Sequence, residues 1–288
     1  MNSEFLIDQL AKLGINPEKY DVLQDKDGVT VARVFENDRS VILKCFEDEA
    51  SRREMTNYRL LSELSVPTLN VLGMSDAAFV MEDIAVAGKY RLATEADMAD
   101  VRVAKKLAEW YRKLHDSGKA YVAEHGAAIY SETGLFTFEN IEYVMYKSGT
   151  QEKPVWRLIQ DNYERIMAFI NNTPMTLTYN DFYYTNMAVA RDDSTAIMFD
   201  YNLLGKGHAF SDMRNVQYSL SKEAAAAFKE AYGEHDFRTE ILIDDAVSPV
   251  VTLYMAYQRA SFPGWAQESL KHVCGGYIGA IEQLLAHA

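Results

Sequence analysis

Cysteine is scarce in this chain of 288 residues, which has only Cys45 and Cys274, far apart in sequence. A disulfide framework is therefore not expected, and a reducing cytoplasm is the predicted location. No apolar run approaches the roughly 20 residues that a membrane-spanning helix needs, so we expect no membrane association. The N-terminus, MNSEFLIDQLAKLG, has acidic residues and a helical period, which are not typical of a signal peptide.

Positive charge is also in short supply. The chain has 29 Lys and Arg against 42 Asp and Glu, a formal net charge of −13. The best basic cluster, Arg102, Lys105 and Lys106, is typical of the exposed face of a helix. Such a chain repels nucleic acid and anionic membrane surfaces, so neither is predicted as a partner. An excess of carboxylates attracts cationic small molecules, although solubility alone also explains it.

Linkers, repeats and low-complexity segments are absent as well, so nothing divides the sequence into autonomous domains. With 48% apolar and 25% charged residues, the composition is that of a globular protein. The length predicts one large domain or two lobes with a sizeable core.

The first third of the chain is rich in strand signals. Three short runs, YDVLQ, VTVARVF and RSVILKCF, are separated by turn formers at 25–28 and 36–39, which predicts an antiparallel meander. A helix is predicted before the meander, over residues 3–13, and another after it, in EDEASRREMTNYRLLSEL. Two more strands are expected around 70–73 and 77–84.

After Thr94 the pattern becomes mainly helical. Helical segments are predicted over 95–117, 137–147 and 153–171, and from Phe210 to the end, including 264–286. Strand-like pieces interrupt them at 175–179, 187–190 and 196–200.

The order of these elements predicts an α+β fold with two lobes. The β-rich N-lobe is expected over 1–84, with a hinge at 81–88, and the mainly helical C-lobe over 89–288. Sites tend to form in the cleft between such lobes.

Two polar stretches, TYNDFYYTN (178–186) and AIMFDYN (196–202), each place an aspartate after a β-like run. A hairpin between them would bring Asn186 close to Asp200, with Asp181 at the same end. An Asp five residues before an Asn is by itself usually a turn or a cap. Together, two carboxylates and one amide are the set that phosphoryl transfer needs, because one carboxylate orients the attacking hydroxyl and the others hold Mg²⁺.

A cation is also needed beside the phosphates. Lys44 stands inside the apolar strand SVILKCF, where a charge requires a reason, and Glu54 on the next helix can pair with it. Alone, Lys44 is also explained as a charge that protects a strand edge, and Glu54 as part of a solvated helix face.

With these residues in place, the sequence resembles the aminoglycoside phosphotransferase and choline/ethanolamine kinase family, which has a protein-kinase-like fold. The family pattern H-[GN]-D-x₄-N, a hairpin and [IF]-D-[WFY]-[ED] is matched by Tyr179-Asn180-Asp181, Asn186 and Phe199-Asp200-Tyr201-Asn202. Other segments are similar to family motifs in the right order: EMTNYRLLSELSVP, FVMEDI (79–84), LAEWYRKLHDSG (107–118) and SDMRNV (211–216). The resemblance spans roughly residues 20 to 220.

The resemblance implies an ATP- and Mg²⁺-dependent small-molecule kinase. Asp181 would position the substrate hydroxyl, and Asn186 and Asp200 would bind Mg²⁺. Lys44, held by Glu54, would contact the nucleotide phosphates. The remaining nucleotide-binding residues that it implies are Met81, Glu82 and Ile84 in the hinge, and Asp27, Gly28 and Thr30 in a turn over the phosphates.

Departures from the family pattern leave alternatives open. Tyr179 replaces the motif histidine, which raises the possibility of an inactive kinase that binds nucleotide. Asn202 replaces a frequent acid, and Tyr183 and Tyr184 suit either the core or a cation-binding acceptor site. The acceptor is expected to be a small hydroxylated cation, either an aminoglycoside-like amino sugar or choline or ethanolamine.

The sequence leaves further choices between related states. The sequence does not decide whether ATP or GTP is the phosphate donor, or whether the protein is a monomer or a homodimer. A third reading is an interaction protein without a nucleotide site. His115 is expected to be structural, capping its helix before Gly118.

Overall fold

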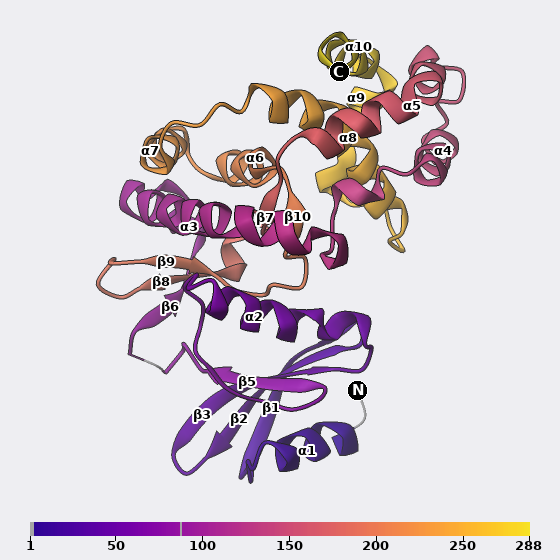
Figure 1. Cartoon of the computed structure of the whole chain (residues 1–288). Coiled ribbons are helices and arrows are strands. Elements are labelled where there is room, and N and C mark those ends of the chain that lie inside the picture. The colour runs from indigo at the N-terminus through magenta and orange to yellow at the C-terminus, as the bar shows by residue number, and fades with distance from the viewer. Residues whose placement is uncertain (1–2, 87) are drawn as a thin grey trace. The chain divides into compact units, whose positions relative to one another are not determined.

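The computed structural model of the chain describes residues 3–86 and 88–288 (Figure 1). Residues in contact form two compact units. The first contains Met1–Ser117, Asp181–Leu204 and Val216–Gly233, and the second contains Gly118–Asn180, Gly205–Asn215 and Glu234–Ala288. Because these units alternate along the chain, the lobe boundary expected near residues 84–89 stays a prediction. In the described part of the chain, no helix has the length and apolar character needed to cross a membrane.

The N-terminal sheet is the predicted antiparallel meander extended by two strands. It has the order β1-β2-β3-β5-β4. Its strands are β1 (Lys19–Lys26), β2 (Val29–Glu36), β3 (Arg39–Phe46), β4 (Val71–Met74) and β5 (Ala78–Glu82). Asp27 and Gly28 both have positive φ, as do Asn37 and Asp38, so each hairpin closes with a two-residue turn of the type that Asn, Asp and Gly favour.

The two faces of this sheet carry different side chains. Leu43 and Cys45 of β3 pack in the cluster that contains Leu6 and Leu10 of helix α1 (Ser3–Lys12). Lys44 points to the opposite face because successive strand residues alternate. Helix α2 (Arg53–Glu63) covers that second face, and α1 and α2 lie on opposite sides of the sheet in Figure 1.

The rest of the first unit is built around a second small sheet. This sheet has the order β6-β8-β9 and carries the hairpin predicted from the sequence. Its strands are β6 (Tyr90–Leu92), β8 (Met187–Ala190) and β9 (Ala196–Met198), and helix α7 (Lys222–Tyr232) belongs to the same unit. Tyr201, just after β9, packs edge-on against Tyr58 of α2 with ring centroids 4.7 Å apart. It also stacks with Trp110 of helix α3 (Val101–His125), with ring centroids 6.4 Å apart, so aromatic rings connect the hairpin to α2 and α3.

The second unit has a helical core and a two-stranded sheet of β7 (Thr176–Thr178) and β10 (Gly205–Gly207). Its helices are α4 (Phe138–Lys147), α5 (Pro154–Asn172), α8 (Arg238–Tyr257), α9 (Gln267–Cys274) and α10 (Tyr277–His287). Local signals begin α4 and α5. The Thr137 hydroxyl accepts from Asn140 N, and Pro154 occupies the first turn of α5. The apolar stripes of these helices form one buried cluster that includes Trp156, Val250 and Ile281.

Two helix ends differ from the sequence prediction. Helix α3 (Val101–His125) continues through Gly118, where a side chain would lie 2.6 Å from Leu177 N. Gly118 therefore permits close contact with β7 and does not end the helix. The predicted cap by His115 is wrong, because its Nδ1 lies 2.8 Å from the hydroxyl of Tyr232. The helix expected over 264–286 is interrupted at Gly275 and Gly276, between α9 and α10.

Candidate active site

Five polar residues expected to act together lie in the first compact unit, and we call them the catalytic cluster. They are Lys44, Glu54, Asp181, Asn186 and Asp200. At its centre, Lys44 Nζ lies 2.6 Å from Glu54 Oε2 and 2.7 Å from Asp200 Oδ1. Burial alone would lower the pKa of Lys44, but the two carboxylates outweigh burial and the pKa is raised. Lys44 therefore stays a cation inside the protein.

Glu54 lies in the first turn of α2, and its side chain is fully buried. Burial raises the pKa of Glu54 to about 7, with the neighbouring Lys44 charge acting in the opposite direction. When Glu54 and Asp200 are both ionised, one ammonium faces two carboxylates and an excess negative charge remains. A buried excess of this kind favours the arrival of a further cation.

Asp181 and Asn186 lie on a short connection that ends in the 3₁₀ turn Tyr184–Asn186. Asn186 Nδ2 lies 3.3 Å from Asp181 Oδ2 and donates to it. The same nitrogen is 3.4 Å from the Asp181 carbonyl oxygen. Because the amide nitrogen faces Asp181, the amide oxygen of Asn186 is directed away from that residue and is available as a ligand.

Asp200 is fixed by its neighbours at the end of the hairpin. Phe199 N donates to the Asn186 carbonyl at 2.9 Å, which joins the two ends as the sequence predicted. Asp200 itself has φ of +63°, a left-handed conformation that a non-glycine residue adopts only when its surroundings impose it. The next residue, Tyr201, is fully buried and its carbonyl accepts from Asn57 Nδ2 at 2.7 Å. Sequence reasoning gave Tyr201 and Asn57 no role, yet they anchor Asp200 beside α2.

The donor set of the cluster fits Mg²⁺. The contact of Asp200 with Lys44 uses Oδ1, and the Asp200 side chain is 32% exposed, so its second oxygen can bind a cation. With the Asn186 amide oxygen it supplies two hard oxygen ligands of the kind that Mg²⁺ prefers. Among the described residues, no three His, Cys, Asp or Glu side chains gather as a metal site of their own.

Asp212 is a further residue that the sequence reasoning quoted within SDMRNV without giving it a role. It lies on α6 (Ala209–Ser219) and is 1% exposed. Its two carboxylate oxygens accept from Tyr179 N at 2.7 Å and from Asn180 N at 2.9 Å. Asn180 has φ of +67°. The carboxylate of Asp212 thus holds the backbone that leads into Asp181, and Tyr179 at the motif histidine position is fully buried.

The hinge expected to bind the base edge begins within β5. Met81 is 7% exposed and pairs with Ile42 of β3, on the same face of the sheet as Lys44. Glu82 N donates to the Asn70 carbonyl, and Ile84 is buried. The hinge residue Asp83 accepts from Arg33 Nε at 2.6 Å and from the Ser40 hydroxyl at 2.7 Å. The carboxylate of Asp83 therefore fixes the hinge to β2 and β3. Ala87 of the expected hinge lies outside the described residues.

The turn expected over the phosphates is the β1–β2 hairpin. At Gly28, with φ of +74°, a side chain would meet Asp48 Oδ2 at 2.8 Å. The turn is thus closely packed against an acidic residue. Thr30 is 2% exposed and its hydroxyl donates to Asp25 at 2.8 Å. Because strand residues alternate, the Thr30 side chain points to the α1 face of the sheet and Lys44 to the opposite face. The Thr30 side chain is therefore directed away from the face where the phosphates are expected, and only the Thr30 backbone can contact them.

The three residues proposed for the acceptor site have different surroundings. Tyr183 and Tyr184 are exposed, at 52% and 37%. Asn202 directs its Oδ1 into the interior, and its carbonyl accepts from Arg53 Nε. Exposed rings suit contact with a ligand, whereas the buried amide oxygen of Asn202 is turned away from solvent.

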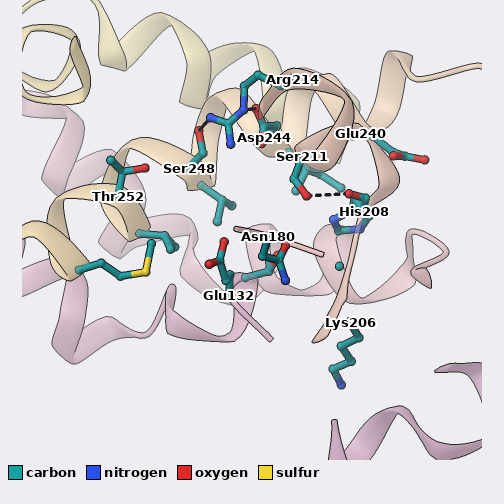
Figure 2. A pocket seen from close by; sticks show the side chains of 16 residues that line it. Glu132, Asn180, Lys206, His208, Ser211, Arg214, Glu240, Asp244, Ser248 and Thr252 are labelled. Carbon is teal, nitrogen blue, oxygen red and sulfur yellow. Dashed lines mark hydrogen bonds and ion pairs between the residues drawn. The ribbon is translucent and has the colours of Figure 1, made fainter. Parts of the chain in front are cut away.

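A pocket in the second unit was not predicted from the sequence. Sixteen residues line it, and its empty volume is about 520 Å³, part of which is open to solvent (Figure 2). We call it the α8 pocket because α8 forms one wall. Asn180, the residue before Asp181 in the chain, also lines it. Burial lowers the pKa of His208 on this wall, which keeps the imidazole neutral. The lining contains no Phe, Tyr or Trp.

No protein-family model and no curated protein matches the chain in sequence. Solved structures do match in fold. The chain is similar to the choline kinase LicA from Streptococcus pneumoniae, with 13% identity, coverage of 96% of this chain and 98% of that one, and a TM-score of 0.64. The macrolide 2′-phosphotransferase MphH from Brachybacterium faecium is 16% identical, with coverage of 94% of this chain and 98% of that one and a TM-score of 0.61. APH(2″)-IIa, in a ternary complex with streptomycin and ATP, is 16% identical, with coverage of 94% of this chain and 96% of that one and a TM-score of 0.64.

These likenesses show the fold. It is the α+β, two-lobed, protein-kinase-like fold of aminoglycoside phosphotransferases and choline/ethanolamine kinases, as the sequence motifs predicted. The likeness extends over nearly the whole of both chains, well beyond the segment that carried the motifs.

Proposed function

We propose that the protein is an ATP- and Mg²⁺-dependent phosphotransferase that acts on the hydroxyl group of a small molecule. The observation that supports this proposal best is the catalytic cluster, in which Lys44 bridges Glu54 and Asp200 while Asn186 faces Asp181. The fold is one that known small-molecule kinases share. GTP as the donor stays an alternative.

Each residue of the cluster has a proposed task. Asp181 orients the acceptor hydroxyl and takes its proton as the oxygen attacks the terminal phosphorus and the bond to the leaving diphosphate breaks. Lys44, held by Glu54, contacts the phosphates that stay on the nucleotide. Asp200 and Asn186 hold Mg²⁺, which neutralises phosphate charge when it is bound. Such catalysis is positioning and charge stabilisation. Met81, Glu82 and Ile84 form the proposed base site, with the Gly28 turn and the backbone at Thr30 beside the phosphates.

We further propose that the acceptor binds in the α8 pocket and carries an amine. Asn180 connects this pocket to Asp181 through a single peptide bond. An amino-sugar-like acceptor agrees with the carboxylate of Glu132 on the pocket wall. Choline stays the alternative, but a quaternary ammonium is usually bound by aromatic faces, and the lining has none. Tyr183 and Tyr184 would have to supply such faces.

A second candidate is a kinase-like protein that binds nucleotide without turnover, and the observation behind it is Tyr179 at the histidine position. The buried Tyr179 ring leaves the Asp212 contacts to the loop in place, so this substitution alone does not remove the machinery. Transfer or ATP hydrolysis above the level of an Asp181→Asn variant would eliminate this candidate. A thermal upshift with Mg²⁺–ATP would argue against an interaction protein without a nucleotide site.

The test is a phosphorylation screen over amino sugars, amino alcohols and hydroxy acids with radiolabelled ATP. Asp181→Asn and Asp200→Asn are each expected to abolish transfer, because the first loses the group that orients the hydroxyl and the second a metal ligand. Circular dichroism spectra should match those of the wild type. Wild-type turnover in either variant with the true acceptor would make the assignment wrong.

A further inference from the structure

His208 is a buried side chain in the wall of the α8 pocket. It lies between β10 and α6, and its side chain is 4% exposed. Its Nε2 is buried and has no hydrogen-bond partner within the described part of the chain. Buried polar atoms in folded proteins are hydrogen-bonded with few exceptions, and each exception needs an explanation. In the wall of a pocket, a ligand that binds there is such an explanation.

The surroundings of His208 decide what its Nε2 binds. Burial lowers the pKa of His208 and is the largest effect. The Glu240 charge and hydrogen bonds to the backbone at Thr173 and Ile170 act in the opposite direction. The resulting neutral imidazole has one N–H and one lone pair. Ile170 and Thr173 lie at the C-terminal end of α5, where carbonyl groups have no partner one turn ahead. Because these carbonyls take the N–H of the ring, Nε2 carries the lone pair and is an acceptor.

The charged groups on the same pocket wall are already engaged with other groups. Glu240 Oε2 accepts from Phe210 N at 2.8 Å, and its Oε1 lies 3.1 Å from His235 Nε2. Arg214 Nε lies 3.1 Å from Asp244 Oδ2, so these two charges neutralise each other. The unsatisfied group of this wall is thus a neutral lone pair, and its natural partner is an uncharged hydroxyl.

Helix α8 gives the pocket two parallel rows of side chains four residues apart, because residues at i and i+4 share a helix face. One row is polar: Glu240, Asp244, Ser248 and Thr252. The adjacent row is apolar: Ile243, Val247, Val251 and Met255. Figure 2 shows His208 and Ser211 at one end of the pocket and Thr252 at the other. A sugar or cyclitol ring, with hydroxyl groups around its edge and C–H groups on its faces, matches both rows.

From this geometry we propose that the acceptor of the kinase has a second hydroxyl group, and that this hydroxyl donates to His208 Nε2. The phosphorylated hydroxyl is a different one, oriented by Asp181. The acceptor class is a polyhydroxylated ring, such as a sugar or a cyclitol, with or without an amine. Ethanolamine and choline have a single hydroxyl and cannot make both contacts. This proposal rests on the proposed function for turnover, but binding in the α8 pocket tests it separately.

The experiment compares ligands that differ by one hydroxyl group. D-Glucose is matched with its 2-deoxy, 3-deoxy, 4-deoxy and 6-deoxy forms, and kanamycin B with tobramycin, which lacks one hydroxyl of kanamycin B. Each compound is tested for phosphorylation with Mg²⁺–ATP and for its effect on Tm without nucleotide, which reports binding to the folded protein. In at least one series, loss of a single hydroxyl should weaken binding about tenfold, because it leaves a buried acceptor atom unpaired.

Variants assign the preference to His208. His208→Phe keeps a flat ring and removes the lone pair, so both members of the discriminating pair should bind equally. His208→Gln keeps an acceptor oxygen and should retain part of the preference. His287→Phe is the matched control, since His287 is exposed, belongs to the same unit and does not line the pocket. The KM for ATP should stay at the wild-type value in all of them.

The wild-type protein provides a direct measurement. Nitrogen NMR of protein with ¹⁵N-labelled histidine distinguishes the two ring nitrogens, and the His208 signals are those lost in His208→Gln. At neutral pH the ring should be uncharged with its proton on Nδ1. The Nε2 signal should shift when the preferred ligand is added, and shift less with its deoxy form.

The two proposals fail in different ways. A proton on Nε2, an Nε2 signal that none of the ligands shifts, or equal binding throughout every series overturns the hydroxyl proposal. The same holds for a hydroxyl preference that survives His208→Phe. Phosphorylation of choline or ethanolamine in preference to every polyhydroxylated ring would also overturn it, but would leave the kinase assignment intact. Binding of such a ring at His208 without any transfer would instead contradict the proposed function.

Discussion

The catalytic cluster and the α8 pocket differ in how their residues are distributed along the chain. In the cluster, Asp181, Asn186 and Asp200 come from strand ends and turns, where short spacings such as that between Asp181 and Asn186 are visible in the sequence, and Lys44 and Glu54 come from β3 and α2. The pocket comes from one face of α8 together with single residues of other segments. Phosphoryl chemistry prescribes the residue types at each position, whereas recognition of an acceptor prescribes only a surface. Function is therefore easier to infer from the sequence than substrate.

The same difference should appear in kinetics. Variants of the cluster should lower kcat with every acceptor, because the group that they lose acts on the transferred phosphoryl. Variants of the pocket should change the KM of the acceptor and leave the KM of ATP unchanged. Residues that contact both regions should break this separation, and residues that contact neither should leave both kinetic constants unchanged.

Asp212 gives the strongest test, because it holds both Tyr179 and Asn180, and Asn180 lines the pocket. Asp212→Ala leaves two backbone N–H groups without their acceptor, which should cost about 2–4 kcal/mol of unfolding free energy. We expect kcat to fall about 100-fold and the KM of the acceptor to rise together. Steady-state kinetics and urea denaturation measure these changes.

Asp212→Asn is the matched control for this prediction. It keeps one acceptor oxygen in the same place, so its effects on kcat and on stability should be smaller. If Asp212→Ala kept the wild-type kcat, the loop before Asp181 would not need this carboxylate, and the connection between the two regions would have to run through other residues.

Glu54→Gln should affect only the cluster. The variant leaves Lys44 paired with Asp200 alone, so Asp200 is less free for Mg²⁺, and we expect kcat/KM for ATP to fall about tenfold. The KM of the acceptor should not change. An acceptor KM that rose as much as the KM of ATP would contradict the separation of the two regions.

The pKa of Glu54 predicts how stability depends on pH. Burial raises this pKa from 4.5 to about 7. Protonation of Glu54 therefore favours the folded state, and its contribution is complete below about pH 4.5 and is lost as the pH rises through 7. Gln resembles the protonated form. Denaturation at pH 5 and pH 8 should therefore show that the free energy of unfolding of Glu54→Gln rises relative to that of the wild type as the pH rises.

A functional residue can be predicted from the sequence when its immediate neighbours in the chain reveal it, and not when its role depends on partners far away in the chain. Lys44 was found because a charge in an apolar strand is a local anomaly, and Asp200 because it ends a hairpin. Asp212 and Arg214 lie in one quoted segment, but their partners are 30 or more residues away, and no local pattern indicates them. Strands β6 (YRL) and β10 (GKG) were not predicted, because neither contains an apolar run like those of the equally short β7 (TLT) and β9 (AIM).

Helix ends show the same limit. Gly118 has the features of a helix C-terminus when only its neighbours in sequence are considered. Its actual role depends on β7, which lies about 60 residues later in the chain, because only a residue without a side chain allows α3 to approach that strand so closely. Pro249, inside α8, likewise does not end its helix. Tertiary contacts overrule local preference at these positions.

The smallest expected kinetic effect belongs to Asp97, which lies outside both regions. Asp97 accepts from Arg91 Nη2 at 2.6 Å and Nη1 at 2.8 Å, and from Thr94 N at 2.7 Å. These bonds, first that to Arg91, lower the pKa of Asp97 to about 2. The carboxylate therefore stabilises the folded state above about pH 4, and the contribution is lost as the pH falls through 2.

Asp97→Asn should lower the free energy of unfolding by about 2 kcal/mol at pH 7, reduce the loss of stability between pH 4 and 2, and leave kcat and both KM values unchanged. Asp236→Asn is the matched control, since Asp236 makes a similar pair with Arg238 but both side chains are largely exposed, so that pair should matter little. Denaturation at several pH values checks both variants. A changed acceptor KM in Asp97→Asn would show that the pocket responds to stability in general, and kinetic constants would then no longer separate the two regions.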